Sequence, residues 1–189
     1  MRTNRLKRLK NRKIAILVTV VVVVLATFLG VVSSVGNHVR NIEAMFYDGV
    51  YLDEEGFTEP GINSHLENSA NAALGFSMLM ADSVLGAEAE ALAAARRELL
   101  AADSISEKYT ANENMRLSFS VLLTATERLE LTDREMEAIE RYASSFAGAQ
   151  TAIERSGYNM EVKNYLDDVS VIAQLFMPFV FASPPQLFG

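Results

Sequence analysis

The side chains that could carry out chemistry are few in this chain, and their spacing matches no common catalytic or metal site. There is no cysteine, which excludes a thiolate nucleophile, a thiolate zinc site and a disulfide framework. The two histidines are His38 and His65, and neither has a zinc-type partner four residues along a helix. A Ser-His-acid triad would have to use one of these two. The sequence therefore predicts no catalytic set, no metal centre and no cofactor.

Carboxylates are abundant, but they are not arranged as in a known acid–base or metal site. The acids of segment 53–59, DEEGFTE, lack the alternating ligand positions of an EF-hand. Asp167 and Asp168 are neighbours, so on a helix they point about 100° apart and do not face each other across a cleft. The Glu-x-x-His motif of di-iron bundles is absent. We interpret these acids as solvated surface, with a weak calcium contact at 53–59 as the alternative.

Charge is divided sharply along the chain, although the net charge is only −7. The first 13 residues contain no acid, and the rest of the chain carries all 24 acids against ten Lys and Arg. An acidic domain of this kind repels phosphate backbones, so nucleic acid is not an expected partner. The basic residues of the N-terminal segment are Arg2, Arg5, Lys7, Arg8, Lys10, Arg12 and Lys13.

An uncharged apolar stretch, IAILVTVVVVVLATFLGVV, runs from Ile14 to Val32 directly after this basic segment. As a helix it would be about 30 Å long, which matches the hydrocarbon thickness of a bilayer. A helix is also the form in which a single segment satisfies its own backbone in lipid. We therefore predict a transmembrane anchor over residues 14–35 with the lipid bilayer as partner. The apolar residues assigned to it are Ile14, Leu17, Val21, Leu25, Phe28 and Val32.

The basic segment also predicts the orientation of this anchor. By the positive-inside rule, residues 1–13 stay in the cytoplasm and the chain after about residue 35 lies outside the plasma membrane. The alternative is a cleaved signal peptide, which the small residues Ser33, Ser34 and Gly36 would suit. The apolar stretch exceeds the 7–15 residues usual for such a signal, so an uncleaved single-pass anchor is the preferred interpretation.

Helical periodicity dominates the chain after the anchor. Residues 37–46 are expected to continue the anchor helix, and Glu88 to Ala102 forms an alanine-rich helix. A further helix is predicted to begin near Ser64, because Ser64 and Glu67 have the spacing of a capping box. Its apolar residues recur at steps of three and four: Ile62, Leu66, Ala70, Ala73, Phe76, Met80 and Val84.

Two more helices are predicted toward the C-terminus. Thr132 and Glu135 form a capping box, with Leu131 and Met136 at the positions of a hydrophobic staple. Gly157 is expected to end that helix as its C′ residue. The inward positions of this helix are Met136, Ile139, Ala143, Phe146, Ala149 and Ile153. Those of the last helix are Tyr158, Val162, Tyr165, Val169, Ile172 and Phe176.

No segment alternates with period two, so the sequence predicts an all-α fold in which a transmembrane helix precedes an antiparallel bundle. Segment 48–61 is read as a loop, because it contains several glycines and a Pro-Gly step. The bundle is assigned to 36–176. The apolar tail 177–189 is rich in Phe and Pro, and we expect it to pack on the bundle, with membrane or partner contact as the alternative.

The stretch KYTANENMRLSF, residues 108–119, places asparagines inside an otherwise helical pattern. Thr110 and Glu113 have capping-box spacing, which would start a helix there. Ser104 and Glu107 have the same spacing and predict instead a helix over about 105–130. We prefer the second start, because it puts Asn112 on the inward apolar stripe. Asn112 would then be a polar seam residue that hydrogen-bonds a neighbouring helix and fixes its register.

Several short motifs, in this order and spacing, resemble the LemA family. They are EAMFYDGVY (43–51), INSHLENSANAALGF (62–76), EKYTANENM (107–115), SGYNMEVKNYL (156–166) and PPQLF (184–188). The Tyr158-Asn159 pair and the Ala111-Asn112 pair are the most specific parts. The chain departs from the family pattern at VSVIAQLFMPF, 169–179, where Pro178 falls later than in relatives. The resemblance implies a membrane helix running into a helical bundle, and it brings no settled reaction.

The expected function follows from the anchor, the acidic bundle and the missing catalytic sets. We expect a non-catalytic helical scaffold or interaction module at the cell envelope, acting on other envelope proteins or by self-association. An extracytoplasmic ligand-binding or sensor bundle is the first alternative, and it would need a membrane partner because about 13 residues face the cytoplasm. An envelope enzyme is the least favoured interpretation.

Overall fold

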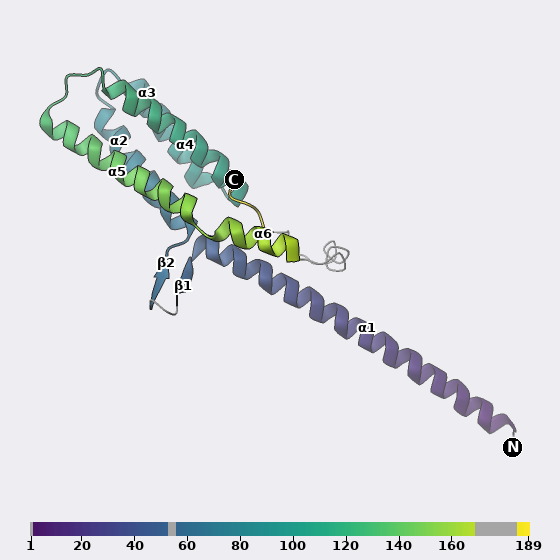
Figure 1. The fold of residues 1–189 in the computed structure, drawn as a ribbon. Helices are drawn as coiled ribbons and strands as arrows, with labels where there is room; N and C mark the ends of the chain where they lie inside the picture. Colours follow the sequence, from purple (N-terminus) through teal and green to yellow (C-terminus); the bar gives the residue numbers. More distant parts are fainter. Residues whose placement is uncertain (1, 53–55, 169–184) are drawn as a thin grey trace. The chain divides into compact units, whose positions relative to one another are not determined.

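The computed structural model describes residues 2–52, 56–168 and 185–189, and helices dominate this part of the chain (Figure 1). This confirms the predicted all-α fold class. The elements in chain order are α1 (Arg2–Tyr47), β1 (Val50–Leu52), β2 (Phe57–Glu59), α2 (Ile62–Met80), α3 (Gly86–Ala101), α4 (Ile105–Thr126), α5 (Asp133–Arg155) and α6 (Tyr158–Asp168).

The chain divides into two compact units. Unit 1 comprises Met1–Asn41 and Asp168–Pro184, and unit 2 comprises Ile42–Asp167 and Pro185–Gly189. The boundary near the N-terminus falls inside α1, whereas the sequence placed the start of the bundle at residue 36. Helix α1 is nevertheless continuous, so its last residues belong to unit 2.

Among the described residues, one helix is long and apolar enough to cross a membrane. From Ile14 onward, α1 contains an 18-residue window of mean hydropathy 3.0, and none of that window is buried. Of the predicted anchor residues, Phe28 and Val32 are half-buried. The others are exposed by 50 to 65%, namely Ile14, Leu17, Val21 and Leu25. Exposure of these apolar side chains to water would be unfavourable, whereas in a bilayer they would face the lipid hydrocarbon.

Two threonines within this stretch satisfy their hydroxyls inside the helix. Thr19 Oγ1 donates to the Ala15 carbonyl at 3.0 Å, and Thr27 Oγ1 donates to the Val23 carbonyl at 2.9 Å. Neither hydroxyl therefore needs water, which suits a helix surrounded by hydrocarbon. Of the seven basic residues before the stretch, the structure describes the side chain of Arg12, which is exposed. The side chains outside the described set are those of Arg2, Arg5, Lys7, Arg8, Lys10 and Lys13.

Unit 2 is built around a four-helix bundle. Helix α2 packs against α3 and α5, and α3 packs against α4 (Figure 1). The connections between consecutive helices of the bundle are short, as expected for antiparallel neighbours. Three aromatic rings pack within the bundle: the Phe76 and Phe119 rings lie 5.1 Å apart, and Phe119 stacks on Phe146 at 4.0 Å with 15° between the ring planes. Such ring pairs stabilise a core beyond the area that they bury.

The predicted capping box of α2 is wrong. The helix begins at Ile62 with Gly61 as N-cap, and no side chain caps it. Ser64 lies in the first turn, where its N–H donates to the Gly61 carbonyl at 3.0 Å, and Glu67 accepts from Asn63 Nδ2 at 2.9 Å. Tertiary packing decides this start. A Cβ at Gly61 would lie 2.5 Å from the Phe46 carbonyl oxygen, so the close approach to the end of α1 requires glycine at the N-cap.

The segment read as a loop contains a small β-hairpin, which corrects the prediction that no strand is present. Strands β1 and β2 pair antiparallel, with Val50 opposite Glu59 and Leu52 opposite Phe57. Each strand has three residues, too few to show alternation in the sequence. Gly49 (φ +86°) precedes β1, and a Cβ there would meet the Glu59 carbonyl oxygen at 1.9 Å. The hairpin therefore depends on glycine at this position.

The C-terminal helices differ from the prediction at their ends. Helix α4 ends at Thr126 rather than near 130. Helix α5 ends because Ser156 adopts an extended conformation (φ −58°, ψ 133°), and Gly157 does not have the positive φ of the expected C′ residue. Met136 is 49% exposed and lies outside the α5 core stripe. In α6, the positions Tyr158, Val162 and Tyr165 are buried as predicted, while 169–176 and the first part of the tail, 177–184, lie outside the described residues.

Candidate functional site

The two histidines of the chain lie on different helices. His38 lies on α1 in unit 1, and His65 lies half-buried on α2 in unit 2. Within the described ranges, no group of three or more His, Cys, Asp or Glu side chains could hold a metal ion. The acids 53–55 and the Asp168 side chain fall outside those ranges.

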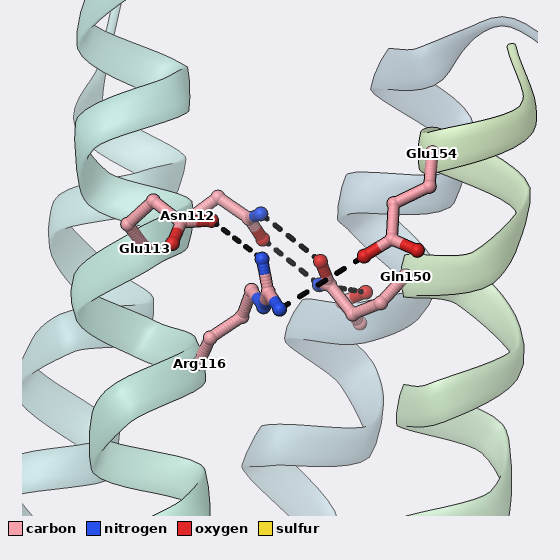
Figure 2. Close-up of polar contacts among 6 residues, drawn as sticks. Asn112, Glu113, Arg116, Gln150 and Glu154 are labelled. Atoms are coloured by element: carbon pink, nitrogen blue, oxygen red, sulfur yellow. Dashed lines mark hydrogen bonds and ion pairs between the residues drawn. The ribbon is translucent and has the colours of Figure 1, made fainter. Parts of the chain in front are cut away.

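The strongest polar feature in unit 2 is a buried network that joins three helices (Figure 2). Asn112 on α4 and Gln150 on α5 face each other: Asn112 Nδ2 donates to Gln150 Oε1 at 3.1 Å, and Gln150 Nε2 donates to Asn112 Oδ1 at 3.0 Å. Gln150 Nε2 also donates to Ser69 Oγ on α2 at 3.0 Å. The exposed fractions are 1% for Asn112, 8% for Gln150 and 0% for Ser69. The prediction that Asn112 is buried and hydrogen-bonds a neighbouring helix is thereby confirmed.

The position of Asn112 follows from the helix start at Ser104. Ser104 Oγ accepts from the Glu107 N–H at 3.2 Å, and Glu107 Oε2 accepts from the Ser104 N–H at 2.9 Å, which completes the predicted capping box. This start puts Asn112 between Ile105 and Phe119 on the buried face of α4. The competing start at Thr110 is wrong, because Thr110 lies within the helix and bonds the Ser106 carbonyl.

Gln150 and Ser69 were not identified from the sequence as partners of Asn112. Gln150 lies on the buried face of α5, four residues after Phe146 and three before Ile153, which is the spacing of an inward position. A polar residue at such a position is the signal that could have identified it. A fully paired buried amide costs little, whereas an amide left with one unpaired end costs about 1–3 kcal/mol. The pairing therefore makes Asn112 and Gln150 dependent on each other.

An ion pair lies at the rim of this network. Arg116 Nη1 contacts Glu113 Oε1 at 2.8 Å along α4, and Arg116 Nη2 lies 3.9 Å from Glu154 Oε1 on α5 (Figure 2). These side chains are 42 to 65% exposed. Exposed pairs of this kind contribute about 0–1 kcal/mol, so the buried amides and not the ions dominate the junction.

Residues 185–189 form a second polar and aromatic feature in unit 2, and for this described part of the tail 177–189 the chain is packed on the unit. We call the residues that hold this segment the tail seat, defined by Phe46, Ser106, Tyr109, Tyr158 and Asn159. Asn159 Nδ2 donates to the Phe188 carbonyl at 2.7 Å, and the Phe188 N–H donates to Asn159 Oδ1 at 2.8 Å. Tyr158 Oη donates to the Gln186 carbonyl at 2.7 Å. Phe188 is 6% exposed.

Burial and hydrogen bonds shift the pKa of Tyr158 and of the two capping glutamates, Glu107 and Glu135. Burial raises the pKa of the Tyr158 phenol, and Glu43 and Tyr47 raise it further, so its hydroxyl remains a donor to the tail. Hydrogen bonds from the Ser104 backbone and hydroxyl lower the pKa of Glu107. In the second predicted capping box, hydrogen bonds from the Thr132 hydroxyl and backbone lower the pKa of Glu135. Both carboxylates therefore serve as caps for helix N-termini.

The cavities of unit 2 are small or open. One of about 170 Å³ lies between the end of α1, the hairpin and the start of α6, and Met45, Gly49, Glu59 and Tyr158 are among its lining residues. This volume is below the 300–1,000 Å³ usual for small-molecule sites. A shallow groove of about 500 Å³ runs between α4 and α5, with Phe119 and Phe146 among its lining residues.

The fold and these features define a class of protein: an all-α chain with, among its described residues, one helix long and apolar enough to cross a membrane, and with a bundle whose apolar core contains a buried amide pair. No protein-family model, curated protein or solved structure matches the chain.

Proposed function

We propose that this chain is a single-pass protein of the LemA type in the plasma membrane of a bacterium. Its N-terminus lies in the cytoplasm, and unit 2 lies outside as a non-catalytic scaffold or interaction module of the cell envelope. The observation that carries the proposal is α1, in which an unburied apolar stretch from Ile14 continues as one helix into Ile42 and Phe46 of unit 2. Ile42 and Phe46 are both buried, so the helix that contains the apolar stretch also contributes its last residues to the core of unit 2.

Two further observations support this role. The basic residues cluster before the apolar stretch, which favours the N-in orientation. The rest of the chain is strongly acidic, which argues against nucleic acid as a partner. In unit 2, the buried amides of Asn112 and Gln150 join helices, and the half-buried amide of Asn159 holds the tail. Their polar atoms thus support the architecture, as expected of an interaction module.

The orientation is testable with single cysteines, because the natural chain has none. We expect Ser144→Cys, at an exposed position on α5, to react with a membrane-impermeant maleimide in intact spheroplasts. Thr3→Cys, before the apolar stretch, should react only after the membrane is opened. The physical reason is the cluster of positive charge, which resists transfer across the membrane. Labelling is read as a mass shift on a gel.

Detergent-solubilised protein is the control, in which both cysteines should react equally. Labelling of Thr3→Cys together with protection of Ser144→Cys would overturn the orientation, and loss of an N-terminal tag from the mature chain would show a cleaved signal. Turnover of a defined substrate by the purified chain, abolished on replacing one acid, would overturn the non-catalytic role.

A further inference from the structure

The last five residues belong to unit 2 through contacts and not through adjacent chain. Residues 185–189 lie in unit 2, and residues 169–184, outside the described part of the chain, separate them in sequence from α6. Within unit 2, the segment Pro-Gln-Leu-Phe-Gly is therefore held in the way that a bound peptide is held. Its contacts with the tail seat show what kind of peptide the seat accepts.

Part of the recognition is directed at the main chain of the tail. Asn159 exchanges two hydrogen bonds with Phe188, one to its carbonyl and one from its N–H, as a residue of an antiparallel strand does. Tyr158 adds a third bond, to the Gln186 carbonyl. These bonds involve the main chain of the segment and are independent of its side chains.

Two side chains of the tail, Gln186 and Phe188, make specific contacts with the tail seat. Gln186 Oε1 accepts from the Ser106 N–H at 3.2 Å, at the first turn of α4. The Phe188 ring lies 5.7 Å from the Phe46 ring and 5.3 Å from the Tyr109 ring, in edge-to-face contact with Tyr109. Leu187, between them, is 36% exposed and therefore contributes less to recognition. The seat thus selects an amide side chain two residues before a phenylalanine.

We propose that the tail seat is a peptide-binding site for an extended Gln-Leu-Phe-Gly terminus, and that the tail of a second copy of this chain occupies it and links the two copies. A seated tail makes the same contacts whichever chain it comes from, so exchange costs mainly the difference in tether entropy. The 16 residues 169–184 span at most about 55 Å, which sets the limit of reach between neighbours. The inference rests on the proposed membrane role for the local concentration of copies.

The experiment uses two full-length chains with different tags, reconstituted together in liposomes. One carries Ser106→Cys in the seat, and the other carries Gln186→Cys in the tail, which gives up the Gln186 side-chain hydrogen bond but keeps the main-chain bonds and the Phe188 ring. A disulfide that joins the two differently tagged chains reports a tail seated in trans. The chain has no natural cysteine to interfere. We expect this heterodimer to exceed, by about tenfold, that of a control pair in which Ser144→Cys replaces Ser106→Cys.

Two changes should lower the crosslink by about tenfold without altering the cysteines. Phe188→Ala in the tail chain removes the ring, and Asn159→Asp in the seat chain replaces the donor to the Phe188 carbonyl with a repelling oxygen. A free acetylated Pro-Gln-Leu-Phe-Gly peptide should compete, and its Phe-to-Ala form should not. Because the cysteine is at position 186, the crosslink is distinguished from any pairing by the second Gln-Leu-Phe at 174–176.

A single chain with both Ser106→Cys and Gln186→Cys controls for folding and for cis occupancy. An internal disulfide in that chain, together with heterodimer at the control level, would overturn exchange between copies. Absence of any internal disulfide in a chain with native helical circular dichroism would overturn the seat itself. Both results are independent of membrane orientation, so failure of the labelling experiment and failure of this one remain distinguishable.

Discussion

Asn112 and Asn159 use the donor and the acceptor of their amide groups together. Asn112 pairs with the amide of Gln150 on another helix, and Asn159 pairs with the main chain of Phe188. At these positions aspartate would lack the donor and leucine would lack both groups, so the amide itself is required.

Replacing Asn112 with leucine should leave a helical chain with a less specific core. Gln150 would remain buried with its amide partner gone, which costs about 1–3 kcal/mol. We expect a lower free energy of unfolding of the full-length chain in detergent, with unchanged far-ultraviolet and weakened near-ultraviolet circular dichroism.

The matched control is Asn112→Leu combined with Gln150→Leu, which removes both amides. Part of the lost stability should return, because no amide is then left unpaired. A single variant as stable as the natural chain, with full near-ultraviolet signal, would show that the pair does not specify the core.

At the scale of elements, local signals set some helix boundaries and packing sets others. The capping boxes at Ser104 and Thr132 involve residues three apart, and the structure contains both. The start of α2 at Gly61 depends on the end of α1 instead. Gly75 on α2 leaves room for the Tyr142 ring of α5, because a Cβ there would collide with Tyr142 Cε1.

Alanine at Gly75 should destabilise the chain although alanine is the better helix former. The Tyr142 ring must leave its place over α2, and we expect this to outweigh the gain of about 1 kcal/mol in helix propensity. Gly148 on α5 is the matched control, because nothing lies within 4 Å of a Cβ there.

Thermal unfolding of the two variants should therefore change in opposite directions, with Gly148→Ala raised and Gly75→Ala lowered. In a Tyr142→Ala background the penalty at Gly75 should disappear. A penalty that persists without the ring would place its origin elsewhere.

The capping boxes also predict how stability depends on pH. Hydrogen bonds lower the pKa of Glu107 and Glu135 in the folded chain from the ordinary 4.5, so the unfolded chain binds these protons more tightly. Their contribution is present above about 4.5 and is lost as the pH falls through the lower folded values. The double variant Ser104→Ala and Thr132→Ala should lose about 1 kcal/mol per cap at neutral pH and show a shallower acid decline.

Urea unfolding of the full-length chain at pH 7 and at steps below 4.5 measures this. Ser120→Ala with Ser145→Ala provides the control, because both are exposed positions inside the same two helices. An equal acid slope in the capping variant and the natural chain would show that other carboxylates control the decline.

At the scale of the whole molecule, one continuous helix joins an apolar segment to a folded unit, and the end of the chain returns to that unit. The first feature underlies the proposed anchoring, and the second underlies the proposed link between copies. The orientation and exchange experiments address these features separately. Together they test whether unit 2 lies outside the membrane and whether the tails link neighbouring copies.

The sequence by itself determined the helical class, the apolar stretch, the caps at Ser104 and Thr132 and the inward position of Asn112. These depend on periodicity or on pairs of residues three apart, and both are local properties of the sequence. Only the tertiary structure decided that Asn112 meets Gln150, 38 residues away, and that Asn159 holds Phe188, 29 residues away. Pairing across helices depends on how whole elements pack, and no local spacing encodes that choice.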